Sequence, residues 1–138
     1  MSESTFVQPL PIPNEDSRQY WEASQKDQFL VQRCKDCGRY RFPPQLMCPH
    51  CWSENTEWLE SSGIGTVYTF GVVRRAIQPR WSNRIPYVVA LVELNEGPKI
   101  FTNIMECEPE EVAIGMQVEV IFDHVTPDIA LPKFRPIR

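Results

Sequence analysis

Four cysteines, arranged as two pairs, constrain this chain more than any other feature of its sequence. The stretch CKDCGRYRFPPQLMCPHC places them at Cys34, Cys37, Cys48 and Cys51, with the spacing C-x₂-C-x₁₀-C-x₂-C. Each C-x₂-C turn can aim two thiolates at one point, and two facing turns complete a tetrahedron around one ion. The pattern therefore predicts a metal-binding module in this part of the chain.

The predicted role of the metal is structural. Four thiolates fill the coordination shell and leave no open position for water or substrate. Zinc is the expected ion, although tetrahedral sulfur also accepts iron, as in a rubredoxin-type centre. Gly38 follows the first pair, where such a turn often needs left-handed backbone. His50 lies within the second pair, and we expect it to be an exposed residue rather than a ligand.

The start of the chain and the paired cysteines indicate the cellular compartment. The start, MSESTFVQPLPIPNEDS, has neither a basic leader nor an apolar h-region, so no secretory signal is expected. Paired cysteines without an export signal favour a metal in a reducing compartment, and we expect a cytoplasmic protein. No apolar run reaches the roughly 18 residues that a membrane span needs. Cys107 stands alone in ECEP and is expected to be a spare thiol.

The sequence patterns before residue 63 predict a helix and a small sheet. Asn14 is a suitable N-cap for a helix over NEDSRQYWEASQKD, which has acidic residues in its first turn. The short run FLVQR is expected to be a strand that leads into the first cysteine pair. TEWLE, which follows the second cysteine pair, alternates between apolar and polar residues and should pair back as a strand.

The sequence after residue 63 predicts about five strands and a small helical insert. The β-rich runs are GTVYTFGVVRRAI, which we expect Gly71 to break, then IPYVVALVEL, KIFTNIME, QVEVIFDHV and IALPKFRPIR. EPEEVAIG, before the fourth of these strands, reads as one helical turn. Short strands at this spacing favour a small closed β-barrel or a sandwich. The expected organisation is an arm and helix (1–27), a metal module (28–61) and a β domain (62–138).

Catalytic groups are scarce in this sequence. None of the motifs GxSxG and HExxH or a phosphate-binding glycine loop is present. His124 ends the strand VIFDH with no nucleophile signature nearby and is expected to be a rim residue. We therefore expect a protein that is not an enzyme by itself.

One segment departs from the acidic character of the chain, whose net charge is −4 with a pI near 5.2. RRAIQPRWSNRIPY contains no acidic residue but holds Arg74, Arg75, Arg80, Trp81 and Arg84. Guanidinium groups beside an aromatic ring could bind a ligand with phosphates and a ring, such as a nucleotide or coenzyme A. They could also stack on single-stranded nucleic acid. The alternative is a solvated hairpin or a protein contact.

Several of these segments together resemble the DUF35 family. The resemblance rests on LVQRCKDCGRYRFPP, CPHCWS, SGIGTVYTF, PYVVALVEL and the terminal FRP, and it covers about residues 15 to 138. It implies a mostly β protein with an N-terminal helix, a rubredoxin-like zinc ribbon and a five-stranded OB-fold barrel. It also implies that Cys34, Cys37, Cys48 and Cys51 are zinc ligands. Family members are generally non-catalytic subunits of thiolase-like enzymes, or of hydratases and retro-aldolases, that act on coenzyme A esters.

The sequence leaves two other functions open. Zinc ribbons and OB-folds also bind nucleic acid, but the acidic total and the presence of only four lysines argue against it, since backbone binding requires phosphate neutralisation. A free-standing acyl-CoA binder or minor enzyme is the third possibility. The preferred expectation is an accessory subunit that forms a hetero-oligomer with an acyl-CoA enzyme, with the coenzyme A ester as a ligand shared with that partner.

Overall fold

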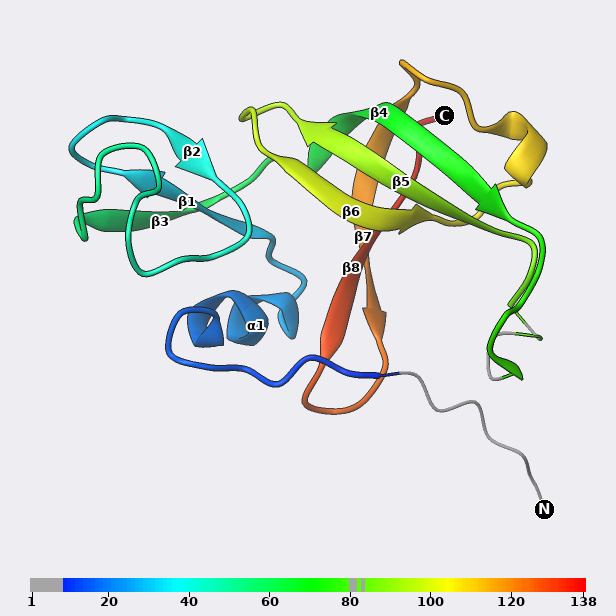
Figure 1. Cartoon of the computed structure of the whole chain (residues 1–138), viewed down its shortest axis with the longest axis horizontal. Helices are drawn as coiled ribbons and strands as arrows, with labels where there is room; N and C mark the ends of the chain where they lie inside the picture. The colour runs from blue at the N-terminus through cyan, green and yellow to red at the C-terminus, as the bar shows by residue number, and fades with distance from the viewer. Residues whose placement is uncertain (1–8, 80–81, 83) are drawn as a thin grey trace.

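The computed structural model describes residues 9–79, 82 and 84–138. It contains a small sheet, a barrel and one short α-helix that lies beneath the sheet (Figure 1). The sheet comprises β1 (Leu30–Cys34), β2 (Tyr40–Arg41) and β3 (Thr56–Glu60). The barrel comprises β4 (Ile64–Val73), β5 (Tyr87–Leu94), β6 (Lys99–Ile104), β7 (Gln117–His124) and β8 (Ala130–Pro136). The predicted mostly β fold is confirmed.

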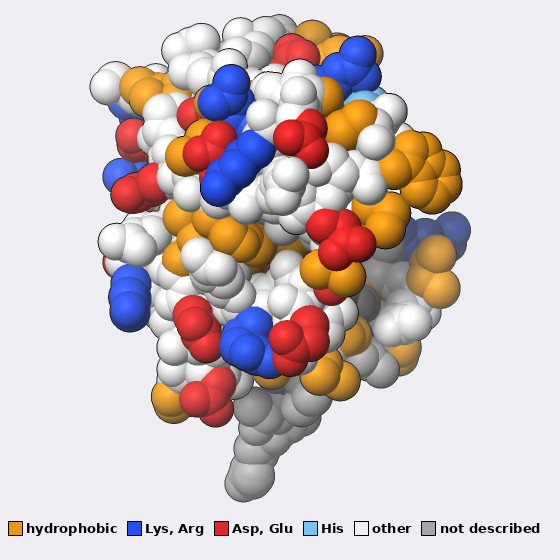
Figure 2. All heavy atoms as spheres, turned by 90° about the vertical axis from the view of Figure 1, so that its left-hand side faces the viewer, with side chains coloured by type: hydrophobic (Ala, Val, Ile, Leu, Met, Phe, Trp, Pro, Cys, Tyr) orange, Lys and Arg blue, Asp and Glu red, His pale blue; other side chains and the backbone are white. Residues whose placement is uncertain are grey.

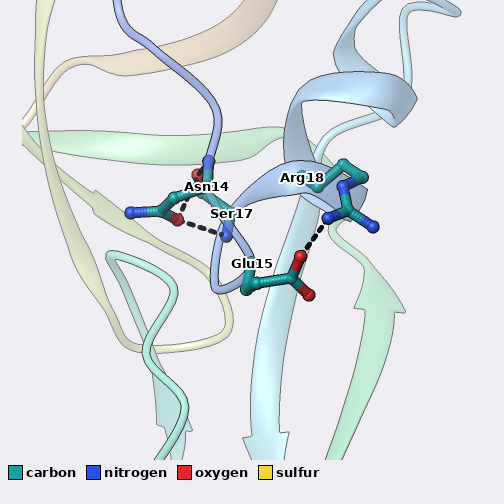
Figure 3. Close-up of polar contacts among 4 residues, drawn as sticks. All are labelled: Asn14, Glu15, Ser17 and Arg18. Carbon is teal, nitrogen blue, oxygen red and sulfur yellow. Dashed lines mark hydrogen bonds and ion pairs between the residues drawn. The ribbon is translucent and has the colours of Figure 1, made fainter.

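The helix α1 (Arg18–Ser24) is shorter than the sequence predicts, because a turn precedes it. The expected N-cap and acidic first turn are wrong for the same reason: the N-cap of α1 is Ser17, which makes no side-chain cap bond, and the first turn has no acidic residue. Asn14 closes the preceding turn instead, where its side-chain Oδ1 accepts a hydrogen bond from the backbone N–H of Ser17 at 3.0 Å. The Ser17 hydroxyl in turn accepts from the N–H of Asn14 at 3.2 Å, and Glu15 pairs with Arg18 in the same turn (Figure 3). These contacts hold the turn that leads into α1.

The small sheet has the strand order β2-β1-β3, and all its pairs are antiparallel. TEWLE forms β3 and pairs back onto β1, with Val31 opposite Leu59, as the alternating pattern predicts. This sheet carries the cysteine-containing loops. We call it, with its loops, the ribbon.

The five strands after residue 63 form a closed barrel in the order β4-β5-β6-β8-β7. β4 closes the barrel by pairing with β7, where Gly65 lies opposite Val118. A 3₁₀ turn, Pro109–Glu111, precedes β7 and is the predicted helical insert. Of the sequence-derived alternatives, the barrel is therefore confirmed and the sandwich is wrong.

The expectation that Gly71 breaks its strand is wrong. β4 runs through Gly71, which pairs with Val89 of β5, and the irregularity of the ladder lies between Val67 and Thr69. A Cβ at Gly71 would meet nothing within 4 Å, so neither packing nor backbone conformation requires glycine there. The extra residue at the bulge is Tyr68, whose side chain is exposed.

Aromatic rings connect the helix, the ribbon and the barrel into one core. Phe29, just before β1, is fully buried, and its ring lies 6.2 Å from that of Phe134 in β8. Tyr20 of α1 contacts Phe29 at 6.1 Å and Phe42 of the ribbon at 5.5 Å, both edge-on. Such ring pairs stabilise beyond the area that they bury.

Candidate metal centre

The fold brings the four predicted cysteines together at one end of the ribbon. One ligand atom from each of Cys34, Cys37, Cys48 and Cys51 lies within 4.8 Å of all the others. The Sγ atoms of Cys34 and Cys51 are 3.5 Å apart, and those of Cys37 and Cys48 are 3.7 Å apart. Cys34 and Cys48 are buried while the other two are exposed. This donor set fits a tetrahedral zinc ion with a closed shell.

Both cysteine turns have the same backbone design. The residue after the second cysteine of each pair has left-handed backbone: Gly38 has a φ of +79° and Trp52 a φ of +67°. The N–H of Gly38 bonds the carbonyl of Cys34 at 2.8 Å, and that of Trp52 bonds the carbonyl of Cys48 at 2.9 Å. The need for left-handed backbone at Gly38 is therefore confirmed, and the second turn meets the same need with a tryptophan.

Backbone donors around the cluster favour thiolates. The N–H of Cys37 points at Cys34 Sγ from 3.4 Å, and the N–H of His50 points at Cys48 Sγ from 3.4 Å. The Cys37 donor is the largest cause that lowers the pKa of Cys34, to about 6, since a hydrogen bond to the charged form stabilises it. A thiolate is the form that a metal ion requires.

A small polar network links the two cysteine turns. Asp36, in the first turn, accepts hydrogen bonds from the Ser53 hydroxyl at 2.5 Å and from the Asn55 amide at 3.1 Å. These two donors hold the pKa of the Asp36 carboxyl below its usual value, because they stabilise the carboxylate. The network joins the loop after the second pair to the first turn, and so helps to fix the two turns against each other.

The two histidines lie outside the cluster. His50 is exposed, as predicted, and its Nδ1 lies 2.8 Å from Arg39 Nη1. His124 Nε2 lies 2.6 Å from Asp27 Oδ1, so that the end of β7 is tied to the turn after α1. Cys107 is partly buried beside the barrel core, and burial raises the pKa of its thiol.

The predicted arginine cluster is only partly described. Arg74 and Arg75 are exposed at the end of β4, and Arg74 pairs with Glu110 of the 3₁₀ turn at 3.2 Å. Arg84 is exposed and lines a cavity of about 220 Å³ together with Tyr87 and Lys133. Arg80 and Trp81 lie outside the described residues.

Sequence reasoning missed a second feature, a cavity of about 580 Å³ where α1, the ribbon and the barrel meet. Its lining includes Trp21, Phe42 and Phe101 together with the polar side chains of Asn103 and Lys133. No local motif marks it, because its lining comes from five separate segments of the chain. The alternation of β6, with Phe101 and Asn103 on the outer face, is the one available signal.

Within the part of the chain that the structure describes, no helix has the length and apolar content needed to cross a membrane.

A four-cysteine ribbon followed by a closed five-stranded barrel defines a zinc-ribbon protein with an OB-fold domain. Two family models match in that order: the rubredoxin-like zinc ribbon domain of ChsH2 over residues 21–57 and the C-terminal OB-fold domain of ChsH2 over residues 58–123. A DUF35 domain-containing scaffold protein from Methanocaldococcus jannaschii is 43% identical over 97 residues, which are 70% of this chain and 68% of that relative. The chain belongs to the DUF35 family.

Two further matches concern enzyme complexes. A solved structure named "Ltp2-ChsH2(DUF35) aldolase" contains a chain that is 38% identical, with a TM-score of 0.81 over 91% of this chain and 98% of that one. A probable enoyl-CoA hydratase alpha subunit from Thermomonospora curvata is 38% identical over 130 residues, or 94% of this chain. This chain spans only 40% of the length of that hydratase subunit.

Proposed function

We propose that this protein is a non-catalytic accessory subunit that docks on an acyl-CoA enzyme. The observation that carries the proposal is the match, along almost its whole length, to the DUF35 chain of the Ltp2-ChsH2 aldolase. The hydratase relative supports the same class of substrate, because its name specifies a coenzyme A ester. Thiolase-type acyl transfer is the partner reaction that the family resemblance favours, with aldolase and hydratase reactions as the alternatives.

Zinc has a structural role in this proposal. Cys34, Cys37, Cys48 and Cys51 would hold the ion, which orders the two cysteine turns and completes the ribbon. The donor set is all sulfur and keeps no position for substrate, so the ion takes no part in the partner's chemistry. Because the ligands must stay reduced, we propose the cytoplasm as the location.

The surface around the second cysteine pair is the proposed docking patch. Leu46, Met47 and Trp52 flank this pair, and their exposed fractions are 62%, 38% and 77%. In Figure 2, which views the molecule from the ribbon side, hydrophobic side chains form clusters between charged groups of both signs. Exposed tryptophan and methionine are enriched in protein interfaces, where burying them provides most of the binding energy.

The arginines at the end of β4 are proposed to face the coenzyme A phosphates or an acidic surface of the partner. Arg74 and Arg75 are exposed, and guanidinium groups bind phosphate in a bidentate manner. Replacing both with alanine should weaken acyl-CoA binding by the complex. Unchanged titration curves for this double variant would contradict a contact with the coenzyme A phosphates. Contact with the partner would then be the proposed role of the two arginines.

Affinity co-purification of the tagged protein from its own host tests the proposed function. We expect a thiolase, aldolase or hydratase chain in near equimolar amount, identified by mass spectrometry. The Trp52→Ala variant should no longer recover the partner enzyme. The control variant Ile114→Ala removes an apolar side chain outside the docking patch, which is 69% exposed, and should still recover it. Recovery of nucleic acid without a partner enzyme would overturn the proposal in favour of a nucleic-acid-binding module.

A further inference from the structure

The barrel has a weakly paired seam between β6 and β8. These two strands are parallel and pair at a single position, Ile104 with Phe134. Beyond it, the contact continues through the Thr102 hydroxyl, which donates to the carbonyl of Pro132 at 3.2 Å. The cavity of about 580 Å³ lies along this seam and is covered from the other side by α1 and the ribbon. A volume of this size holds a small organic ligand.

The walls of this cavity are mainly apolar. Trp21 and Tyr20 from α1, Phe42 from the ribbon and Phe101 from β6 present aromatic rings to it. Phe101 points away from the barrel interior, with 77% of its surface exposed, although its strand neighbours Ile100 and Thr102 are buried. Pockets that bind small molecules combine such walls with a few fixed polar groups.

The fixed polar group here is the ammonium of Lys133 on β8. The side chain is partly buried, and its Nζ donates to Asn103 Oδ1 at 2.6 Å. Asn103 is held in turn, since its Nδ2 donates to the carbonyl of Val88 at 2.9 Å. Among the described residues, the ion pairs do not include Lys133, so its charge has no carboxylate within 4.0 Å. Burial lowers the pKa of this lysine, because desolvation disfavours the charged form.

A partly desolvated ammonium whose hydrogen-bond partner is neutral gains more from an anion than an exposed lysine does. Arg84 adds positive charge near it, since it lines the adjoining cavity of about 220 Å³ and acts electrostatically on Lys133. Two carboxylates limit this potential: Asp123 lines the smaller cavity and acts on Lys133 more strongly than Arg84 does, and Asp16 lines the larger cavity. They disfavour a second negative charge on the ligand and so select a monoanion over a dianion.

We propose that the seam binds an amphiphilic monoanion, with its carboxylate at Lys133 and Asn103 and its alkyl or aromatic part against Trp21, Phe42 and Phe101. All the residues of the proposed site come from this chain. The site is therefore independent of the proposed docking function, and either proposal can fail without the other.

A matched pair of fluorescent probes tests the charge requirement on the isolated, zinc-loaded chain. The anionic probe is 8-anilinonaphthalene-1-sulfonate, and the neutral one is its parent without the sulfonate, N-phenyl-1-naphthylamine. We expect the anionic probe to bind and to be displaced by decanoate but not by decanol. Lys133→Met should weaken the anionic probe about tenfold while leaving the neutral probe unchanged, because one charge-assisted contact is lost.

Three further variants complete the experiment. Lys99→Met removes a lysine from the same barrel that does not line the cavity, and it should bind both probes normally. Lys133→Arg should retain the anionic probe, since the charge remains. Phe101→Ser should weaken both probes, because it removes an apolar wall. No binding of the anionic probe to the wild-type chain, or equal affinity in Lys133→Met, overturns the proposal.

Discussion

Trp52 combines two properties that seldom occur together at one residue. Its side chain is 77% exposed, and its backbone has a φ of +67°, a conformation that costs a side-chain-bearing residue about 1 kcal/mol. The equivalent position of the first turn is Gly38, which adopts this conformation without the penalty. The tryptophan thus lowers the stability of the ribbon, and we infer that its side chain is there to bind.

Two substitutions at this position separate conformation from binding. Trp52→Ala and Trp52→Gly both remove the ring, so both should lose the partner enzyme. In urea unfolding of the zinc-loaded protein, the glycine variant should be more stable than the alanine variant by about 1 kcal/mol, because only glycine is free of the left-handed strain. Equal stability would show that the turn does not hold this conformation.

At the residue scale, the sequence predicts ligands better than it predicts supporting contacts. The four cysteines are recognisable because their spacing alone encodes a tetrahedral site. Arg41 has no such signal, yet it is 5% exposed and donates through Nη2 to Thr56 Oγ1 at 2.7 Å and to the carbonyl of Gln45 at 3.0 Å. Nothing in its local sequence distinguishes this buried guanidinium from the exposed arginines around it, since its burial depends on the loop that covers it.

At the element scale, β4 offers a direct test of the barrel register. A Cβ at Gly65 would lie 2.6 Å from Val92 Cγ1 and 2.7 Å from the carbonyl oxygen of Glu93, whereas one at Gly71 would meet nothing within 4 Å. Gly65→Ala should therefore cost about 3 kcal/mol of unfolding free energy through overpacking. Gly71→Ala, on the same strand, should be neutral or slightly stabilising. Similar denaturation midpoints for both variants would argue against this register.

The β4 strand also shows where sequence patterns fail for an element. The β-rich runs predict all five barrel strands, and EPEEVAIG predicts the insert before β7. Glycine is taken as the breaker at position 71, but the bulge falls at Tyr68, which is an ordinary strand residue. The closed order of strands likewise comes from pairings such as β6 with β8, which join segments far apart in the chain and which no local pattern encodes.

The ribbon as an element should depend on its metal. Chelation of zinc should unfold residues 28–61, because the binding free energy of a structural zinc is also folding free energy. Metal analysis should give one zinc per wild-type chain. Cys48→Ser should lose it, while Cys107→Ser, which changes the one cysteine outside the cluster, should retain it. A ribbon that keeps its amide protection from hydrogen exchange after chelation would contradict the structural role of the metal.

At the scale of the whole molecule, the question is whether the ribbon and the barrel unfold together. The division into residues 28–61 and 62–138 stays a prediction, and the shared core argues for coupling. Phe29 and Phe134 are 2% and 0% exposed and contact each other across the junction. Unfolding the ribbon alone would expose the ring of Phe134, and unfolding the barrel alone would expose the ring of Phe29. Each exposure costs roughly 2 kcal/mol.

We therefore expect one cooperative transition for the zinc-loaded protein. Tryptophan fluorescence can report on the helix and ribbon, which contain Trp21, Trp52 and Trp58, once Trp81→Phe has removed the fourth tryptophan. Far-UV circular dichroism reports mainly on the barrel strands. Coincident urea curves from the two signals indicate a single unit, and Phe29→Ala should separate them because it removes the ring that joins the two parts. Separate transitions in the Trp81→Phe protein itself would show that the ribbon folds independently and that the junction is a hinge between two domains.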